Sequence, residues 1–199
     1  MKLSRLVRPF ALSAAMALCG EGALAEAVTY NIDPAHVWLV FKIQQYVFGK
    51  AVGQFKHVRG VIKFDHADVT ASSVTAEIEV DSVDTGDEGR DAEVPGFIGV
   101  GAHPKITFTS TKVEKLDDTH GRVTGDLTLA GKTQSVSLEV TFNGEADSMF
   151  TGVHTIGFSA NGSVNADDFG IPGLKDMKDT KLGPEVDYQI EVQALKSAN

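Results

Sequence analysis

A period-two alternation of apolar and polar residues runs through most of this 199-residue chain. Successive side chains of a β-strand point to opposite faces of the sheet, so this alternation gathers the apolar residues on one face. No window of a dozen residues shows the repeat of about 3.6 residues that is typical of an amphipathic helix. The pattern predicts an all-β protein. It is clearest in segment 74–81, where Val74, Ala76, Ile78 and Val80 alternate with Thr75, Glu77, Glu79 and Asp81.

Alternating segments of this kind recur from residue 39 to residue 192. With the stretch 55–64 they amount to about eight long antiparallel strands, and Gly131-Lys132 predicts a tight turn between two of them. Long strands leave unpaired edges, which an up-and-down barrel removes by closing on itself. A β-sandwich, the alternative, would have more numerous and shorter strands. We therefore expect an eight-stranded antiparallel up-and-down barrel.

Two segments interrupt the strand pattern. Residues 84–104 are rich in Gly, Asp and Glu, and we expect a short helix after Asp87. Residues 165–184 contain Gly170, Pro172 and Gly173 within a charged cluster, which predicts a long loop. Because no linker or internal repeat is found, residues 26–199 are expected to form one domain.

The N-terminus has the layout of a secretory signal peptide. An apolar run at residues 10–18, too short to span a bilayer, follows the basic residues Lys2, Arg5 and Arg8. Ala23-Leu24-Ala25 supplies the small residues of a cleavage site, so we expect residues 1–25 to be removed. A lipoprotein would be processed at Cys19, but Leu18 is bulkier than that cleavage tolerates. The product is expected to be exported, most simply to the periplasm.

The acidic composition of the chain excludes some classes of binding partner. The chain has 18 basic and 27 acidic residues, and loss of residues 1–25 leaves 15 and 26, a formal net charge of −11. This argues against nucleic-acid binding and against electrostatic docking on anionic lipids, which both need a basic surface. Cys19 leaves with the signal peptide, which excludes disulfides, thiol chemistry and cysteine-ligated zinc from the mature protein.

No catalytic or metal-binding motif stands out. The acidic segment 84–93 lacks the spacing of an EF-hand and is expected to be a solvated loop in which Arg90 and Asp91 have a structural role. A nucleophilic serine would need a Gly-x-Ser-x-Gly turn before a helix, and this motif is missing. We therefore expect no enzyme, no metal and no cofactor. The histidines lack the paired spacings of a zinc site and are expected to have surface or hydrogen-bonding roles: His36, His57, His66, His103, His120 and His154.

Several segments, in a consistent order along the chain, resemble the YceI-like family. They are DPAH (33–36), GQFKHVRGVIKFD (53–65), SVDTGDEGRD (82–91), HPKITFTST (103–111) and VTGDLTLAGKTQSVSLEV (123–140), with a weaker match at DDFG (167–170). The resemblance implies a small exported protein with a lipocalin-like barrel that holds a polyisoprenoid lipid, such as a polyprenyl phosphate or an isoprenoid quinone. Gln44-Gln45 and Ala166 depart from the family, which commonly has His and Arg at these places. The segment after Asp91 departs from it as well.

If a barrel forms, one apolar face lines its interior and would contact the ligand. Arg90 is the cation expected near the head group of that ligand. Glycines within or at the ends of strands are expected to mark bulges, barrel corners or a close approach of the ligand: Gly53, Gly60, Gly125, Gly157 and Gly162. The predicted lining residues are Leu39, Phe41, Ile43, Phe55, Ile78, Val80, Ile106, Phe108, Leu127, Leu138, Val140, Phe158 and Ile190.

The resemblance and the strand pattern together predict an exported carrier of an isoprenoid lipid or quinone. One alternative is an interaction or structural barrel without ligand that uses surface apolar residues such as Trp38 and Val40; a small-molecule enzyme is another. Trp38 alternates with Leu39, so it is expected at a homodimer contact or under a loop. Since apolar burial grows with tail length, we expect a longer tail to tighten binding more than a phosphate does. Ala166 favours a neutral head group such as a quinone.

Overall fold

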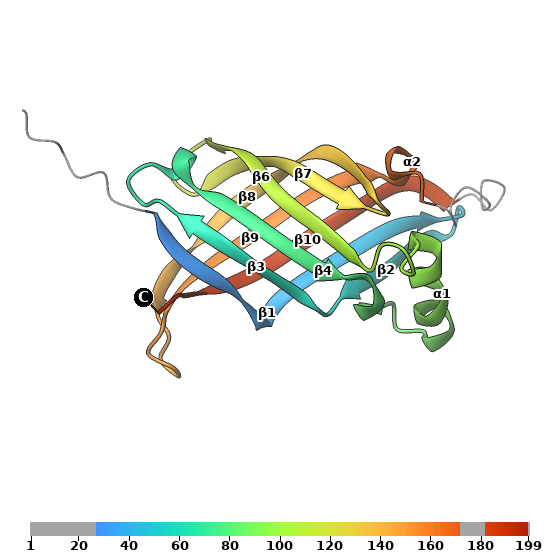
Figure 1. Ribbon diagram of the computed structural model, residues 1–199, viewed down its shortest axis with the longest axis horizontal. Coiled ribbons are helices and arrows are strands. Elements are labelled where there is room, and N and C mark those ends of the chain that lie inside the picture. The colour runs from blue at the N-terminus through green and yellow to red at the C-terminus, as the bar shows by residue number, and fades with distance from the viewer. Residues whose placement is uncertain (1–26, 172–181, 199) are drawn as a thin grey trace, which may run out of the picture.

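The strands close into one barrel in the computed structural model, which describes residues 27–171 and 182–198 (Figure 1). In this part of the chain the hydrogen-bonded order is β10-β9-β8-β7-β6-β4-β3-β1-β2-β5, and a further pairing of β10 with β1 closes the sheet. The strands are β1 (Val28–Gln45), β2 (Gly49–Phe55), β3 (Val58–Phe64), β4 (Ser73–Glu79), β5 (Val83–Asp84), β6 (Lys105–Lys115), β7 (His120–Leu129), β8 (Lys132–Asp147), β9 (His154–Asn165) and β10 (Leu182–Lys196).

Two pairs of these strands are halves of bent strands. β1 pairs with β3 over residues 28–31 and with β2 over residues 39–45, so β2 and β3 continue one another. β5 continues β4 after the 3-10 helix η2 (Val80–Ser82), while a second 3-10 helix, η1 (Val69–Ala71), joins β3 to β4. Counted in this way, the barrel has eight long antiparallel strands, which confirms the predicted fold class.

The expected helix after Asp87 is α1 (Glu88–Ile98). The Asp87 carboxylate caps it by accepting a hydrogen bond of 2.8 Å from the backbone N–H of Arg90. Gly99 ends the helix in the left-handed conformation, with φ 86°. Val94 and Ile98 pack against the core, which places α1 at one end of the barrel (Figure 1).

The prediction of a single long loop at residues 165–184 was wrong at both of its ends. α2 (Ala166–Phe169) begins with the Asn165 side chain accepting a hydrogen bond from the Asp167 backbone N–H at 2.9 Å. Phe169 and Ile171 are buried, and they anchor this segment to the barrel. β10 already starts at residue 182. The many charged residues of the segment obscured its two apolar anchors.

The β7–β8 turn lies one residue earlier than Gly131-Lys132. Leu129 pairs with Lys132, and the two residues between them have φ angles of 50° (Ala130) and 75° (Gly131). Two consecutive positive φ angles are typical of a type I′ hairpin turn, whose twist matches that of the flanking strands. Gly131 adopts this conformation without strain, whereas Ala130 does so against its steric preference.

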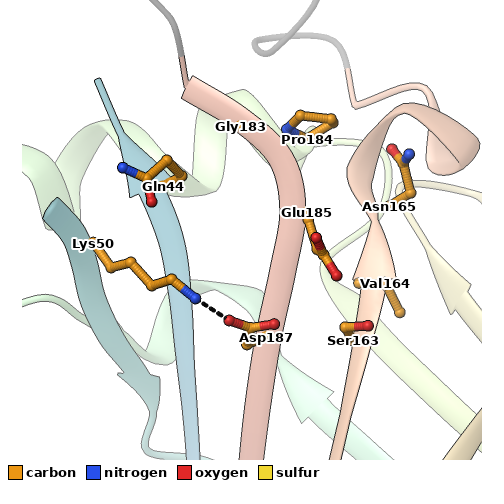
Figure 2. A pocket seen from close by; sticks show the side chains of 9 residues that line it. All are labelled: Gln44, Lys50, Ser163, Val164, Asn165, Gly183, Pro184, Glu185 and Asp187. Atoms are coloured by element: carbon orange, nitrogen blue, oxygen red, sulfur yellow. Dashed lines mark hydrogen bonds and ion pairs between the residues drawn. The ribbon is translucent and has the colours of Figure 1, made fainter. Parts of the chain in front are cut away.

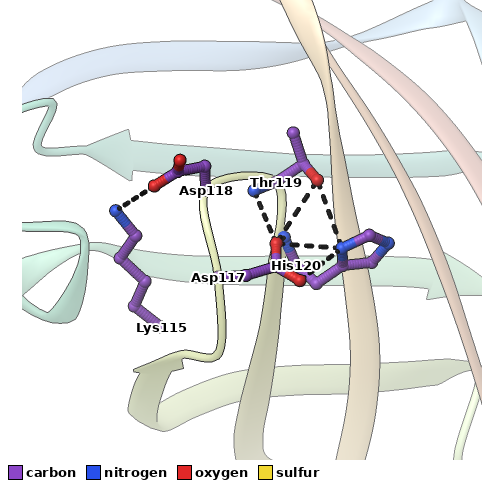
Figure 3. Close-up of polar contacts among 5 residues, drawn as sticks. All are labelled: Lys115, Asp117, Asp118, Thr119 and His120. Carbon is purple, nitrogen blue, oxygen red and sulfur yellow. Dashed lines mark hydrogen bonds and ion pairs between the residues drawn. The ribbon is translucent and has the colours of Figure 1, made fainter.

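Asp117 fixes the turn between β6 and β7 (Figure 3). Its carboxylate accepts hydrogen bonds of 2.8 Å from the backbone N–H groups of Thr119 and His120. These bonds, with the His120 side chain, lower the pKa of Asp117 to about 2. Because this pKa lies below its ordinary value, the turn contributes stability at neutral pH that is lost as the pH falls toward 2.

The predicted signal peptide, Cys19 and the cleavage site after Ala25 lie outside the described residues, and so does the part of the predicted loop at 172–181. Within the described residues, no helix is both long and apolar enough to cross a membrane.

Candidate functional site

All thirteen predicted lining residues lie on the inner face of the barrel. Directly paired residues of antiparallel strands share a face, and such pairs run around the wall. Leu39, for example, pairs with Phe55 on one side and with Ile190 on the other. Val80 differs in lying on η2 rather than on a strand. Six of the thirteen lining residues are buried, namely Phe55, Ile78, Val80, Ile106, Phe108 and Leu138. Seven are half-buried, namely Leu39, Phe41, Ile43, Leu127, Val140, Phe158 and Ile190.

One end of the barrel is filled by an aromatic plug formed by Tyr30, Phe64, Phe142 and Phe158. Phe64 lies 5.5 Å from Phe142 and 5.6 Å from Phe158 between ring centroids, distances typical of packed aromatic pairs. Ile156 and Ala194, which pack in the same cluster, have no exposed surface. This is the end where β1 begins and β10 ends (Figure 1). The barrel is therefore sealed on this side.

The opposite end is covered by the two helices. The buried Phe169 of α2 and Val80 of η2 belong to one apolar cluster, against which Val94 and Ile98 of α1 pack. Ala166, where the sequence departs from the expected pattern, is 1% exposed in this cluster. A cation at this position would be buried among apolar side chains, so Ala166 has a packing role here.

The inner wall between these two ends is not tightly packed. Phe41, Val140, Tyr188, Ile190 and Val192 face inward, yet each keeps part of its surface accessible. Inward side chains of a small barrel filled by its own residues would be buried. These five residues therefore keep accessible surface on the inner face, where the wall is largely apolar.

Three of the five strand glycines have a different role from the one expected. Gly53, Gly125 and Gly162 make room for aromatic rings, because an added methyl group would lie 2.4–2.5 Å from atoms of Phe41, Phe108 and Tyr188, respectively. Each ring lies across a glycine of the neighbouring strand and thus along the wall.

The remaining two strand glycines differ from each other. Gly60 lies against the β4 backbone, where an added methyl group would come within 2.3 Å of the Thr75 carbonyl oxygen, so close strand contact explains it. Gly157 pairs with Gly144 directly after the register shift between Phe142 and Gly144, and it therefore borders a bulge as expected.

Arg90, the predicted head-group cation, holds the loop before α1. Its Nε donates to Thr85 Oγ1 at 2.8 Å and its Nη2 donates to the Thr85 carbonyl at 3.0 Å. Asp91 accepts hydrogen bonds from the same threonine, at 2.7 Å from the backbone N–H and 2.6 Å from the hydroxyl. Both residues thus have the structural role that the sequence indicated. Contact of Arg90 with a ligand stays a prediction.

Five of the histidines pair with acidic side chains. His36 lies 2.7 Å from Asp33, and His154 bridges Asp147 at 2.8 Å and Glu145 at 3.2 Å. The two carboxylates, Asp147 first, raise the pKa of His154. No group of three or more acidic, histidine or cysteine side chains suited to a metal occurs among the described residues. The other pairs are His57 with Glu79, His66 with Glu145, and His120 with Asp117.

A groove of about 640 Å³, which sequence reasoning missed, opens at the ends of β1, β2, β9 and β10 (Figure 2). Lys50 and Asp187 form an ion pair across it, which raises the pKa of Lys50. Lys50 of β2 and Asp187 of β10 both lie on the outer face, and the strand register brings them together. Lys50 and Asp187 neutralise each other, so this groove is a weaker candidate for a ligand-binding site than the barrel interior. Its lining residues are Gln44, Lys50, Ser163, Val164, Asn165, Gly183, Pro184, Glu185 and Asp187.

Trp38 lies on the outer face of β1, as its alternation with Leu39 predicted. It is 47% exposed, and its nearest aromatic neighbour is the His36 ring, 6.4 Å away between centroids. It is therefore not covered by a loop of the described chain. The homodimer contact at Trp38 stays a prediction.

Comparison with known proteins agrees with this architecture. The family model for the YceI-like domain matches residues 30–194. Protein YceI of Escherichia coli O157:H7 is 36% identical over 179 residues, which are 86% of this chain and 89% of that protein.

Two solved structures share the fold. BcnA of Burkholderia cenocepacia superposes with a TM-score of 0.73 at 23% identity, over 81% of this chain and 98% of that one. A polyisoprenoid binding domain from Saccharophagus degradans, implicated in plant cell wall breakdown, has a TM-score of 0.64 at 16% identity, over 85% of this chain and 99% of that one. Because the family model matches most of the chain and a relative is 36% identical over 86% of it, the chain belongs to the YceI-like family.

Proposed function

We propose that this protein is an exported, periplasmic carrier that binds the chain of a polyisoprenoid lipid or isoprenoid quinone inside its barrel. One observation carries the proposal: an apolar inner wall that keeps accessible surface between two covered ends. The similarity in fold to a polyisoprenoid binding domain supports it. The proposed activity is binding rather than catalysis.

The apolar wall makes tail length the main source of affinity. Burial of each methylene contributes about 0.8 kcal/mol, whereas one hydrogen bond contributes about 1 kcal/mol net. A single isoprene unit of the tail therefore adds more than a single polar contact does. A charged phosphate must stay outside the apolar interior, in contact with water, because its burial without a partner is very unfavourable.

The test is binding of a ligand series to the mature protein. The affinities of prenols, prenyl phosphates and isoprenoid quinones of matched length are compared. In a second experiment, the lipid that co-purifies with the protein is extracted and its mass is determined by mass spectrometry. We expect an extractable isoprenoid, and affinity that rises more with each added isoprene unit than with a phosphate.

Binding of the same ligand series to the Arg90→Ala variant tests whether Arg90 contacts the head group. With Arg90 engaged by Thr85, we expect this variant to bind phosphates and neutral lipids as the wild type does. A strong phosphate preference that Arg90→Ala abolishes would contradict the neutral-head proposal. Absence of isoprenoid binding throughout the series would contradict the carrier function itself.

A further inference from the structure

Tyr188 is a polar side chain within an apolar part of the inner wall. It lies near the middle of β10, where it pairs with Phe41 of β1 and with Gly162 of β9. Its ring packs against the buried cluster of Phe108, Leu138 and Ala160, as do hydrocarbon side chains such as Val140 and Ile190. The tyrosine ring is thus part of an apolar cluster.

The Tyr188 hydroxyl has no hydrogen-bond partner. Among the described residues, it is the one buried side-chain nitrogen or oxygen atom without a partner. A buried hydroxyl left unpaired destabilises the protein, so such groups in native proteins usually have a partner that is a protein group, a water or a ligand. Burial also raises the pKa of Tyr188, in agreement with dry surroundings.

Gly162 determines where this ring lies. A methyl group at Gly162 would come within 2.5 Å of the hydroxyl oxygen and 2.8 Å of the ring carbon that carries it. The glycine therefore lets the ring rest along the wall, with the hydroxyl pressed against the backbone of β9. A turn of the ring away from Gly162 would break no hydrogen bond of that hydroxyl.

We propose that the Tyr188 hydroxyl turns into the barrel and hydrogen-bonds an uncharged oxygen atom, a hydroxyl or a carbonyl, of the bound lipid. This inference rests on the proposed lipid-binding function. A neutral oxygen suits the position, because a phosphate would need a cation and the surrounding cluster consists of apolar side chains. The oxygen-bearing end of a prenol or quinone is then held inside the barrel, whereas a phosphate stays outside.

The experiment measures the affinities of geranylgeraniol and of the matching hydrocarbon that lacks only the hydroxyl group. Wild-type mature protein is compared with Tyr188→Phe, which removes one oxygen atom and keeps the ring. We expect Tyr188→Phe to weaken geranylgeraniol binding by about fivefold to tenfold, the value of one hydrogen bond, and to leave hydrocarbon binding within about twofold. Because the removed hydroxyl is unpaired, the ligand-free variant should unfold at the same temperature as the wild type or higher.

Tyr30→Phe is the matched control. Tyr30 also faces inward, but its hydroxyl lies in the aromatic plug, 3.4 Å from His66 Nε2. This variant should leave the ratio of alcohol to hydrocarbon affinity unchanged. The same ratio in wild type and Tyr188→Phe would overturn the inference, including the case in which both ligands weaken together. Failure of both ligands to bind the wild type is a different result, which contradicts the proposed function.

Discussion

At the scale of single residues, aromatic rings laid across glycines shape the inner wall. Phe108 rests over Gly125, where an added methyl group would lie 2.5 Å from both the ring and the Thr109 carbonyl oxygen. The ring can move, but the β6 backbone cannot without breaking its ladder. We therefore expect Gly125→Ala to lower the free energy of unfolding by about 2–3 kcal/mol, as overpacking in a core does. Urea unfolding at neutral pH measures this change.

Gly157→Ala is the control for that prediction. It lies in β9, and its methyl group would meet its nearest neighbour at 3.7 Å, an ordinary contact. Its effect should stay within about 0.5 kcal/mol, as for substitutions without a steric conflict. If the two substitutions lowered the free energy of unfolding equally, the loss of glycine flexibility, and not the close contact, would explain the effect of Gly125→Ala.

At the scale of elements, the β8–β9 hairpin is closed by His154, which pairs with Asp147 across the last rung. Because the pKa of His154 is raised in the folded protein, the contribution of its charge is full below the unfolded pKa of about 6.5 and is lost as the pH rises through the folded value. We expect His154→Gln to destabilise the protein more at pH 5.5 than at pH 8.5. Thermal unfolding at both pH values measures the difference.

The two carboxylates supply the control for this hairpin. In a background with Asp147→Asn and Glu145→Gln, His154→Gln should lose its dependence on pH, because the neutral amides no longer favour the imidazolium. If the effect of His154→Gln on stability still depends on pH in this background, the pH dependence arises from another group.

At the scale of the whole molecule, the proposed export of the barrel depends on removal of residues 1–25. We expect the protein recovered from the periplasm to begin at Glu26 with an unmodified N-terminus, since the small residues before it suit signal peptidase. N-terminal sequencing and the intact mass check this. A mature chain that begins at a lipid-modified Cys19 would instead establish a lipoprotein.

Much of the barrel could be predicted from local pattern. The alternation at residues 74–81 needs only the geometry of a strand, and Asp87 indicated the start of α1 because capping is a local interaction. The anchors Phe169 and Ile171 were missed because their burial depends on a distant end of the barrel. The Lys50–Asp187 pair was missed for a similar reason, since the two lie 137 positions apart in the chain.

The sequence alone therefore determined the all-β class, the eight strands, the inner face and the family resemblance, because each depends on residue order within a strand or motif. Tertiary structure alone decided which end the aromatic plug seals, that strand glycines lie under rings, that Arg90 is bound to Thr85, and that the Tyr188 hydroxyl lacks a partner. Each of these depends on strand register and on the depth of a side chain along the barrel. Alternation fixes the face of a residue, but depth comes only from the contacts between strands that closure brings together.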